Sequence, residues 1–293
     1  MIWDVIKSII YGIVEGITEW LPISSTGHII LTQNFISFND VSSGFPEMFN
    51  YVIQLGAIFA VILLFFKKLW PFKMPDKGAK VLSVNTGIFK EQQWVLWFKV
   101  LIATLPSVLA LPIDSKIEEI MYDEATGKPT NLGVGVISAM LIFYGILFII
   151  IERYNKKRSP IIQDVSMLSY KTALLIGLFQ VLAIIPGTSR SGATIIGALI
   201  LGVSRSAAAE FSFFMAVPTM VGISALKILQ FLSENPFTTD EFIILLVGMI
   251  VSFVVSVIAI RALMAYVKKK DFSFFGYYRI VLGLIVLAFV IFN

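Results

Sequence analysis

A broken apolar segment near the start of the chain reads Gly12-Ile-Val-Glu15-Gly-Ile-Thr-Glu19-Trp-Leu-Pro22-Ile-Ser24-Ser25-Thr26-Gly27-His28. A second, about 165 residues later, reads Gly177-Leu-Phe-Gln180-Val-Leu-Ala-Ile-Ile-Pro186-Gly187-Thr188-Ser189-Arg190-Ser191-Gly192-Ala-Thr194. Each is apolar up to a proline and then continues with small hydroxylated residues. Two interrupted hydrophobic segments at matching places in two halves indicate a binding site between inverted repeats. Polar groups inside a membrane segment are costly and usually functional.

The overall composition is that of a polytopic membrane protein. The 293 residues are 57% hydrophobic and 14% charged, with a mean hydropathy of +0.87. The chain has no cysteine, which excludes disulfides, thiolate catalysis and cysteine-based zinc sites. Its single histidine excludes any mechanism that needs two. The N-terminus has no basic region before an apolar stretch, so we expect no cleaved signal peptide.

Several segments are apolar enough to span a bilayer, which takes roughly 20 helical residues. Trp3, Trp20, Trp70 and Trp94 lie near segment ends, where interfacial aromatic residues are expected. We predict spans at about 48–66, 94–112, 133–151, 207–229, 242–263 and 275–292.

The two broken regions, 2–36 and 168–204, are each split by proline into short halves. A proline ends the first helix of each region, and the hydroxyls after it suit an N-cap. Broken backbone at membrane depth is tolerated only inside protein or beside water, so we expect re-entrant hairpins. The predicted fold is an all-α integral membrane protein with six transmembrane helices and two re-entrant helix hairpins in an inverted-topology repeat. This single domain, 1–293, comprises repeats at about 1–155 and 165–293; eight full spans are the alternative.

Lysine and arginine in the loops predict the orientation, because cytoplasmic loops are enriched in both. With the hairpin arrangement, loops 67–93, 152–171 and 264–279 lie on one side and carry fifteen of these residues. Loops 113–132 and 230–241 lie on the other side and carry two. We therefore expect both termini outside, and a site between the hairpin tips that faces the outer side.

Glu15 and Glu19 are four residues apart and so share one helix face. Paired carboxylates that face a bundle interior suit a hard divalent cation or acid–base chemistry. The alternative is a solvated face, which the apolar neighbours Ile13, Ile17 and Trp20 make unfavourable. We predict that Glu15 and Glu19 bind a divalent cation, Mg²⁺ or Ca²⁺, because the expected ligands are hard oxygens.

The run from Ser24 to His28 follows the first proline. A serine three residues before a histidine at a helix start can bring hydroxyl and imidazole together, as in the nucleophile and base of covalent catalysis. The other interpretation is a serine N-cap followed by a buried structural histidine. Beside two intramembrane glutamates, we favour catalysis by Ser25 and His28.

The run from Pro186 to Thr194 has the composition of a phosphate cradle. Its glycines let the backbone approach an anion, and the N–H groups of a starting helix point toward it. Arg190 adds a forked, permanently charged partner for phosphate oxygens. The alternative is a capped turn with a snorkelling arginine, which requires Arg190 near the interface. Carboxylate pair, hydroxyl and cradle together are the inventory for hydrolysing a phosphoric anhydride or ester.

At these residues the chain closely resembles the bacterial undecaprenyl-diphosphate phosphatases, the family linked to bacitracin resistance. The resemblance extends over nearly the whole chain, and its supporting runs are Val52-Ile-Gln54-Leu-Gly56, Gly202-Val-Ser204-Arg205 and Glu210-Phe-Ser-Phe. It implies hydrolysis of undecaprenyl diphosphate to undecaprenyl phosphate and inorganic phosphate, which recycles the carrier lipid for cell-wall synthesis. It also implies a divalent-cation requirement and the double re-entrant, inverted-repeat fold.

The resemblance implies a polyprenyl-diphosphate phosphatase, with Ser25, His28, Glu19 and Arg190 as the expected catalytic residues. It leaves open whether Ser25 or His28 attacks phosphorus; we favour Ser25 as nucleophile and His28 as its base. The metal would lie at Glu15 and Glu19, and Glu19 would also move protons. We expect a multi-pass protein of the bacterial cytoplasmic (inner) membrane. Its expected partners are polyprenyl diphosphate and membrane lipids, with no nucleic acid, and the sequence does not specify the oligomeric state. The substrate would be held by hydroxyls and one guanidinium, those of Ser24, Thr26, Ser189, Arg190, Ser191 and Thr194.

Three other functions fit parts of the pattern. A membrane transporter or lipid flippase with a midplane anion site shares the inverted repeats and broken helices. The membrane lipid phosphatases that use two histidines are excluded by the single histidine. A structural scaffold would not need Arg190 and two carboxylates at depth.

Overall fold

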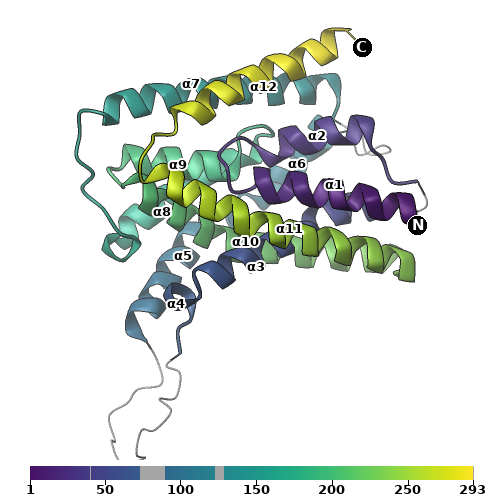
Figure 1. The fold of residues 1–293 in the computed structure, drawn as a ribbon, viewed down its shortest axis with the longest axis horizontal. Coiled ribbons are helices and arrows are strands. Elements are labelled where there is room, and N and C mark those ends of the chain that lie inside the picture. The colour runs from purple at the N-terminus through teal and green to yellow at the C-terminus, as the bar shows by residue number, and fades with distance from the viewer. Residues whose placement is uncertain (40, 73–89, 123–128, 293) are drawn as a thin grey trace, which may run out of the picture.

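The computed structural model describes residues 1–39, 41–72, 90–122 and 129–292, and Figure 1 shows them as an all-helical bundle. Four described helices are long and apolar enough to cross a membrane. A fifth candidate is the pair α5 (Glu91–Leu109) and α6 (Leu111–Met121), which bends by 50°. The prediction of a helical membrane protein is therefore confirmed, with four or five candidate spans. The four single helices are α3 (Phe45–Leu64), α7 (Asn131–Asn155), α10 (Arg205–Glu234) and α11 (Thr239–Val267).

Both broken regions consist of two helices around a break. The first contains α1 (Ile2–Thr18) and α2 (Ser25–Phe35), and Figure 1 shows α2 running back beside α1. The second contains α8 (Tyr170–Val181), a short 3₁₀ turn and α9 (Arg190–Ile200), which packs against α8. The predicted helix breaks near Pro22 and Pro186 are thus present. The chain ends with α12 (Ser273–Phe292), which packs along α7.

Helix ends differ from the predicted bounds where polar caps extend a helix. Ser204 accepts a hydrogen bond from Ala207 N at the start of α10, and Thr238 forms a capping box with Glu241 at the start of α11. Part of the predicted loop 113–132 is helical, because α6 runs to Met121. Several lysines counted to predict the orientation lie outside the described residues, namely Lys73, Lys77, Lys80 and Lys128.

Helices α3 and α10 are antiparallel neighbours joined by an ion pair at each end. At one end, Lys68 in α4 (Phe66–Leu69) binds Glu210 with Nζ and Oε2 2.6 Å apart. At the other end, Lys227 binds Glu47. In each pair, an acidic residue in the first turns of one helix meets a lysine at the far end of the other.

Small residues bring two further helix pairs into close contact. A Cβ on Gly12 would lie 2.7 Å from the carbonyl oxygen of Gly248, so α1 packs tightly against α11. A Cβ on Gly177 would lie 2.0 Å from the carbonyl oxygen of Ala103, so α8 packs in the same way against α5. Glycine at both places therefore permits a backbone approach that any larger residue would prevent.

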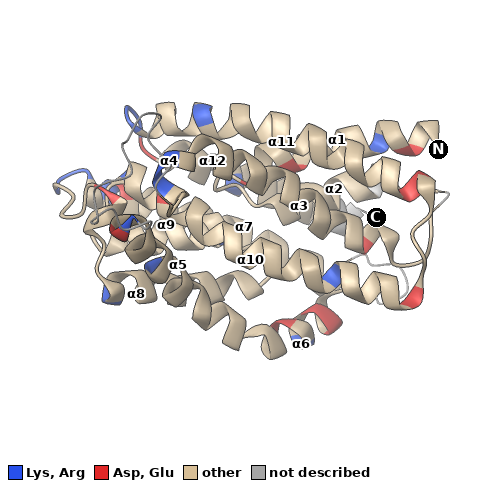
Figure 2. Cartoon of the chain, turned by 90° about the horizontal axis from the view of Figure 1, so that it is seen from below, with Lys and Arg blue, Asp and Glu red and all other residues tan. Residues whose placement is uncertain are grey.

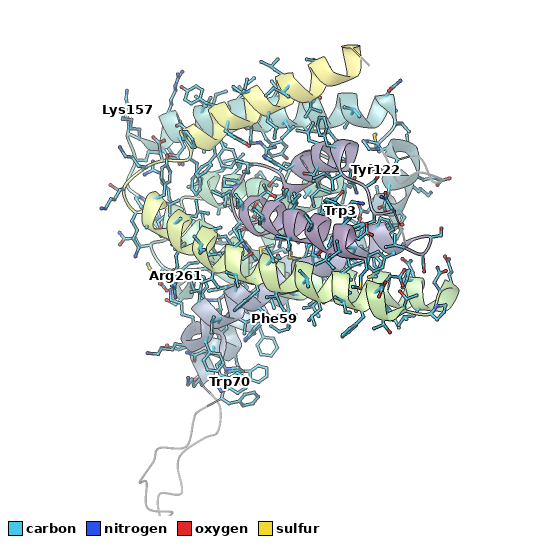
Figure 3. All side chains as sticks on the ribbon, turned by 45° about the vertical axis from the view of Figure 1, so that its right-hand side comes forward. Trp3, Phe59, Trp70, Tyr122, Lys157 and Arg261 are labelled. Atoms are coloured by element: carbon cyan, nitrogen blue, oxygen red, sulfur yellow. The ribbon has the colours of Figure 1, made fainter. Side chains whose placement is uncertain are left out.

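The outer surface is apolar over much of the bundle, as lipid contact requires. Phe59 and Trp70 point away from the helices, with exposed fractions of 56% and 39% (Figure 3). Trp20 has no exposed surface and packs edge-on against Phe213. The prediction that Trp20 is an interfacial residue is therefore wrong, because the helix break buries it in the core.

Candidate active site

Two serines with the same unusual backbone conformation form the breaks of α1–α2 and α8–α9. Ser24 has φ 73° and Ser189 has φ 70°, and they are the only described residues other than glycine with positive φ. Each is the N-cap of the following helix, where its hydroxyl accepts a hydrogen bond, from Gly27 N and Gly192 N respectively. Positive φ is disfavoured for residues with a Cβ, and such strain is concentrated at functional sites.

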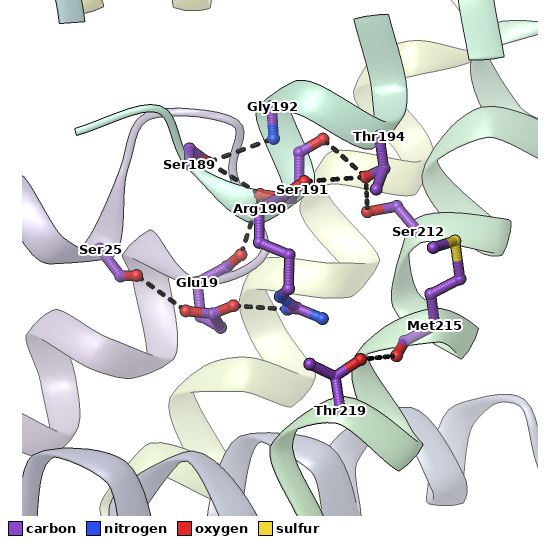
Figure 4. Close-up of polar contacts among 10 residues, drawn as sticks. All are labelled: Glu19, Ser25, Ser189, Arg190, Ser191, Gly192, Thr194, Ser212, Met215 and Thr219. Atoms are coloured by element: carbon purple, nitrogen blue, oxygen red, sulfur yellow. Dashed lines mark hydrogen bonds and ion pairs between the residues drawn. The ribbon is translucent and has the colours of Figure 1, made fainter. Parts of the chain in front are cut away.

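Glu19 lies between the two breaks and binds a residue from each (Figure 4). Its Oε1 accepts a hydrogen bond from Nη2 of Arg190 at 2.6 Å. Its Oε2 accepts one from the hydroxyl of Ser25 at 2.8 Å. The carboxylate is 6% exposed and the guanidinium side chain 15%, so the pair is shielded from solvent. The two motifs thus lie in contact, as predicted, and Glu19 is the residue that connects them.

Two charged side chains among the predicted site residues have buried atoms with no hydrogen-bond partner among the described residues. One is the carboxylate of Glu15, of which neither oxygen has a partner. The other is Nη1 of Arg190. Glu15 lies in α1, one helical turn before the C-cap residue Glu19. Buried polar groups are nearly always paired, so these atoms mark places for a ligand, an ion or water.

His28 makes two bonds, and neither is to Ser25. Its Nδ1 lies 2.7 Å from the carbonyl oxygen of Ser24, which requires a proton on Nδ1. Its Nε2 lies 2.7 Å from the hydroxyl of Tyr278, and the two rings stack. The expected hydroxyl–imidazole pair is therefore not formed, because the Ser25 hydroxyl points to Glu19.

The hydroxyls of the second break have different surroundings: those of Ser189 and Ser191 lie near Glu19, whereas that of Thr194 is buried against α10. Ser189 and Ser191 have their oxygens 3.2 Å apart, and Ser191 also donates to the backbone oxygen of Glu19. Thr194, one turn further on, is 1% exposed and lies 2.7 Å from the hydroxyl of Ser212 (Figure 4). Thr194 therefore fixes α9 against α10. Thr26, also predicted to contact substrate, is half-buried.

Arg279 in α12 is the residue that the sequence interpretation missed. It was counted with loop 264–279, yet it is fully buried and holds both breaks. Its Nη1 donates to the Pro22 carbonyl at 3.3 Å, and its Nη2 to those of Gly187 and Thr188 at 2.8 and 3.0 Å. The only available signal was a charge four residues inside the predicted span 275–292.

Comparisons with known proteins agree on one family. Residues 8–285 match the family described as bacitracin resistance protein BacA. A protein named undecaprenyl-diphosphatase from Latilactobacillus sakei is 52% identical over 287 residues, which cover 97% of each chain. One of the same name from Enterococcus faecalis is 52% identical over 97% of this chain and 96% of its own. Another from Lachnoclostridium phytofermentans is 50% identical over 98% and 97%.

Proposed function

The chain belongs to the BacA family of bacitracin resistance proteins, and we infer from this membership and its site that it is an undecaprenyl diphosphatase. It removes the terminal phosphate of undecaprenyl diphosphate and leaves undecaprenyl phosphate and inorganic phosphate. The lipid product is the carrier for cell-wall synthesis. A polar site enclosed by apolar helices suits a substrate with a charged head and a long hydrocarbon tail.

The arrangement that carries the mechanism is the placement of Ser25 and Arg190 on the two oxygens of Glu19. A hydroxyl that donates to a buried carboxylate is oriented to lose its proton to it. Arg190 keeps Nη1 free for a phosphate oxygen while Nη2 remains on Glu19. Nucleophile, base and anion-binding group are thus adjacent.

In the first step, Ser25 Oγ forms a bond to the terminal phosphorus and its proton passes to Glu19. The bond between that phosphorus and the bridging oxygen breaks, and undecaprenyl phosphate leaves with the electron pair. Water then attacks the phosphorus of the phosphoserine, and the bond between that phosphorus and the serine oxygen breaks. The serine oxygen recovers the proton held by Glu19, and inorganic phosphate leaves with the two protons of the water. Arg190 stabilises the negative charge on the phosphoryl oxygens in both steps. Glu19 thereby replaces His28 as the base next to Ser25.

His28 and Arg279 act on the geometry of the site. Through Nδ1, His28 holds the Ser24 carbonyl at the point where the backbone has positive φ. Arg279 fixes the carbonyls on both sides of the site, at Pro22 and at Gly187 and Thr188. Both are positioning residues: Arg279 bonds to the backbone of the two breaks, and His28 bonds to the Ser24 backbone and to the Tyr278 hydroxyl.

A divalent cation fits the unpartnered oxygens of Glu15. Magnesium or calcium takes oxygen ligands, and Glu15 and Glu19 would hold it. The described residues include no group of three or more His, Cys, Asp or Glu side chains that could hold an ion alone. The remaining ligands would therefore come from the diphosphate. When bound, the ion would neutralise charge on the diphosphate and polarise its phosphoryl oxygens.

We propose that the helices form two inverted repeats, about 1–155 and 165–293, with six spans and two re-entrant hairpins. The reciprocal ion pairs of α3 and α10 support this, as do the matching contacts of α1 with α11 and of α8 with α5. So do the two serine caps of equal geometry. A two-fold relation in the membrane plane exchanges the members of each pair.

We also propose that both termini and the site face the outer side of the cytoplasmic membrane. Figure 2 shows Lys and Arg concentrated at the end of the bundle that carries α4 and α8. The opposite end, near the N-terminus and α6, carries mainly Asp and Glu. The basic end corresponds to the cytoplasmic side.

Phosphate release from undecaprenyl diphosphate by the purified protein in detergent tests this function. The parent enzyme should release one phosphate per lipid, and Ser25→Ala should release none above background. Substrate binding without phosphate release would instead support a transporter or flippase with an anion site.

A further inference from the structure

An open cavity lies at the basic end of the bundle, and none of its lining residues belongs to the candidate active site. Its volume is about 480 Å³. It forms where the end of α7, the start of α10 and the connection between α11 and α12 come together. The lining residues are Lys156, Arg205, Tyr266, Lys269, Lys270, Asp271, Phe274 and Tyr277.

A buried carboxylate, that of Glu152, holds the lining residue Arg205 in place. Glu152 is 1% exposed, accepts a two-point interaction from Arg205, and also accepts the backbone N–H of Phe272. These bonds connect α7, α10 and the segment before α12. The run Gly202-Val-Ser204-Arg205, which the reaction does not use, is thereby explained as the segment that presents Arg205 here. Arg205 uses Nε and Nη2 on Glu152, and no described residue accepts a hydrogen bond from its Nη1, which remains for a ligand.

The charge of the lining is strongly positive. The lining holds four cationic side chains and one carboxylate, that of Asp271, while the buried Glu152 outside the lining neutralises Arg205. Lys156, Lys269 and Lys270 are exposed, and none of them forms an ion pair with another described residue. An anion is therefore the complementary ligand.

The rim of the cavity is aromatic and faces outward from the bundle. Phe274 is 60% exposed and Tyr277 is 54% exposed, next to the lysines. Aromatic side chains at the end of membrane helices lie at the level of lipid headgroups. A cationic pocket beside such a rim suits an anion with an attached hydrocarbon chain, and basic pockets between membrane helices bind anionic headgroups.

We propose that this cavity binds the phosphate group of an anionic phospholipid, whose acyl chains leave past Phe274 and Tyr277. The site is separate from the hydrolytic one and does not depend on its mechanism. Lipid bound there would bridge α7, α10 and α12, and so hold closed the end of the bundle opposite α6.

Native mass spectrometry in dodecyl maltoside tests the proposal, with dioleoylphosphatidylglycerol titrated onto the full chain. Each lysine near an anionic headgroup contributes roughly five-fold in affinity. The double variant Lys269→Gln/Lys270→Gln should therefore bind the first lipid roughly 25-fold more weakly. Lys269→Arg/Lys270→Arg, which keeps the charges, should bind it as the parent does.

The matched control is Lys157→Gln/Lys171→Gln, which removes two charges outside the cavity lining (Lys157 is labelled in Figure 3). It should bind lipid as the parent does, and a thermal unfolding scan verifies that each variant is folded. An equal loss in this control would show diffuse attraction and overturn the proposal. Equal binding of dioleoylphosphatidylcholine would do the same. If inorganic phosphate displaces the lipid at equal concentration, the site is one for a free anion and the lipid assignment is wrong.

Discussion

Replacing Glu19 by glutamine tests the proposed mechanism at its centre. The amide keeps the size of the carboxylate and keeps one oxygen that can accept a hydrogen bond from Arg190. In the parent protein, Nη2 of Arg190 lies 2.6 Å from Oε1 of Glu19. The amide nitrogen, however, is a donor and would face the hydroxyl of Ser25, which in the parent protein lies 2.8 Å from Oε2 of Glu19. The hydroxyl would then accept rather than donate, so its proton would point away from any base.

The expected loss of activity follows from this reversal. General-base catalysis contributes about 10²–10⁴-fold to rate, so Glu19→Gln should lose kcat within that range. The structural cost is smaller, because one hydrogen bond to a charged group contributes about 1.5–3 kcal/mol and the amide oxygen preserves part of it. Activity should therefore fall far more than stability does.

The assay is phosphate release from undecaprenyl diphosphate under single-turnover conditions, with thermal unfolding measured on the same samples. Glu47→Gln is the matched control, since it removes a carboxylate from the exposed ion pair with Lys227. This control should retain parental activity. A Glu19→Gln enzyme within about threefold of the parent would refute the base assignment, because general-base removal costs about 100-fold or more.

The remaining predictions concern other parts of the same site. Arg190→Lys should lose most kcat because lysine lacks the planar fork, and near-normal turnover would reduce Arg190 to a point charge. Excess chelator should inactivate the enzyme reversibly, and Glu15→Gln should raise the Mg²⁺ concentration needed for half-maximal rate; full activity in chelator contradicts the metal site. Arg279→Lys should lower kcat by up to about 100-fold without a matching change in KM, since misplaced breaks disturb the geometry of reaction. Ser24→Gly should unfold at nearly the parental temperature and Ser24→Ala at a lower one, because alanine keeps the strained Cβ and loses the cap; equal values would argue against strain.

The sequence was sufficient for the two breaks and for their meeting. Proline followed by hydroxyls ends one helix and caps the next, whatever the rest of the chain does. The partner of the Ser25 hydroxyl could not be predicted in this way. Positive φ at Ser24 redirects the start of α2. Nothing in the sequence indicates that a serine will adopt positive φ. As a result, Ser25 faces Glu19 across the break instead of His28 along the helix.

The role of Arg279 could not be predicted from the sequence for a different reason. A charge near the end of an apolar segment fits a loop or a helix end equally well, and its contacts come from residues about 90 and 257 positions away. Only the packing of α12 along α7 brings it to the breaks. The orientation count changes accordingly, since Arg279 is buried and no longer belongs with the basic loops.

The buried position of Arg279 links catalysis to folding. A helix break at membrane depth frees backbone carbonyls that lipid cannot satisfy, and each unsatisfied group costs several kcal/mol. The same breaks are what bring Ser25 and Arg190 to one carboxylate. Arg279 has no carboxylate partner among the described residues, and its N–H groups donate to the freed carbonyls of Pro22, Gly187 and Thr188. The two helix breaks therefore require Arg279 to satisfy their carbonyls, and a variant that removes its guanidinium should lose activity and stability together.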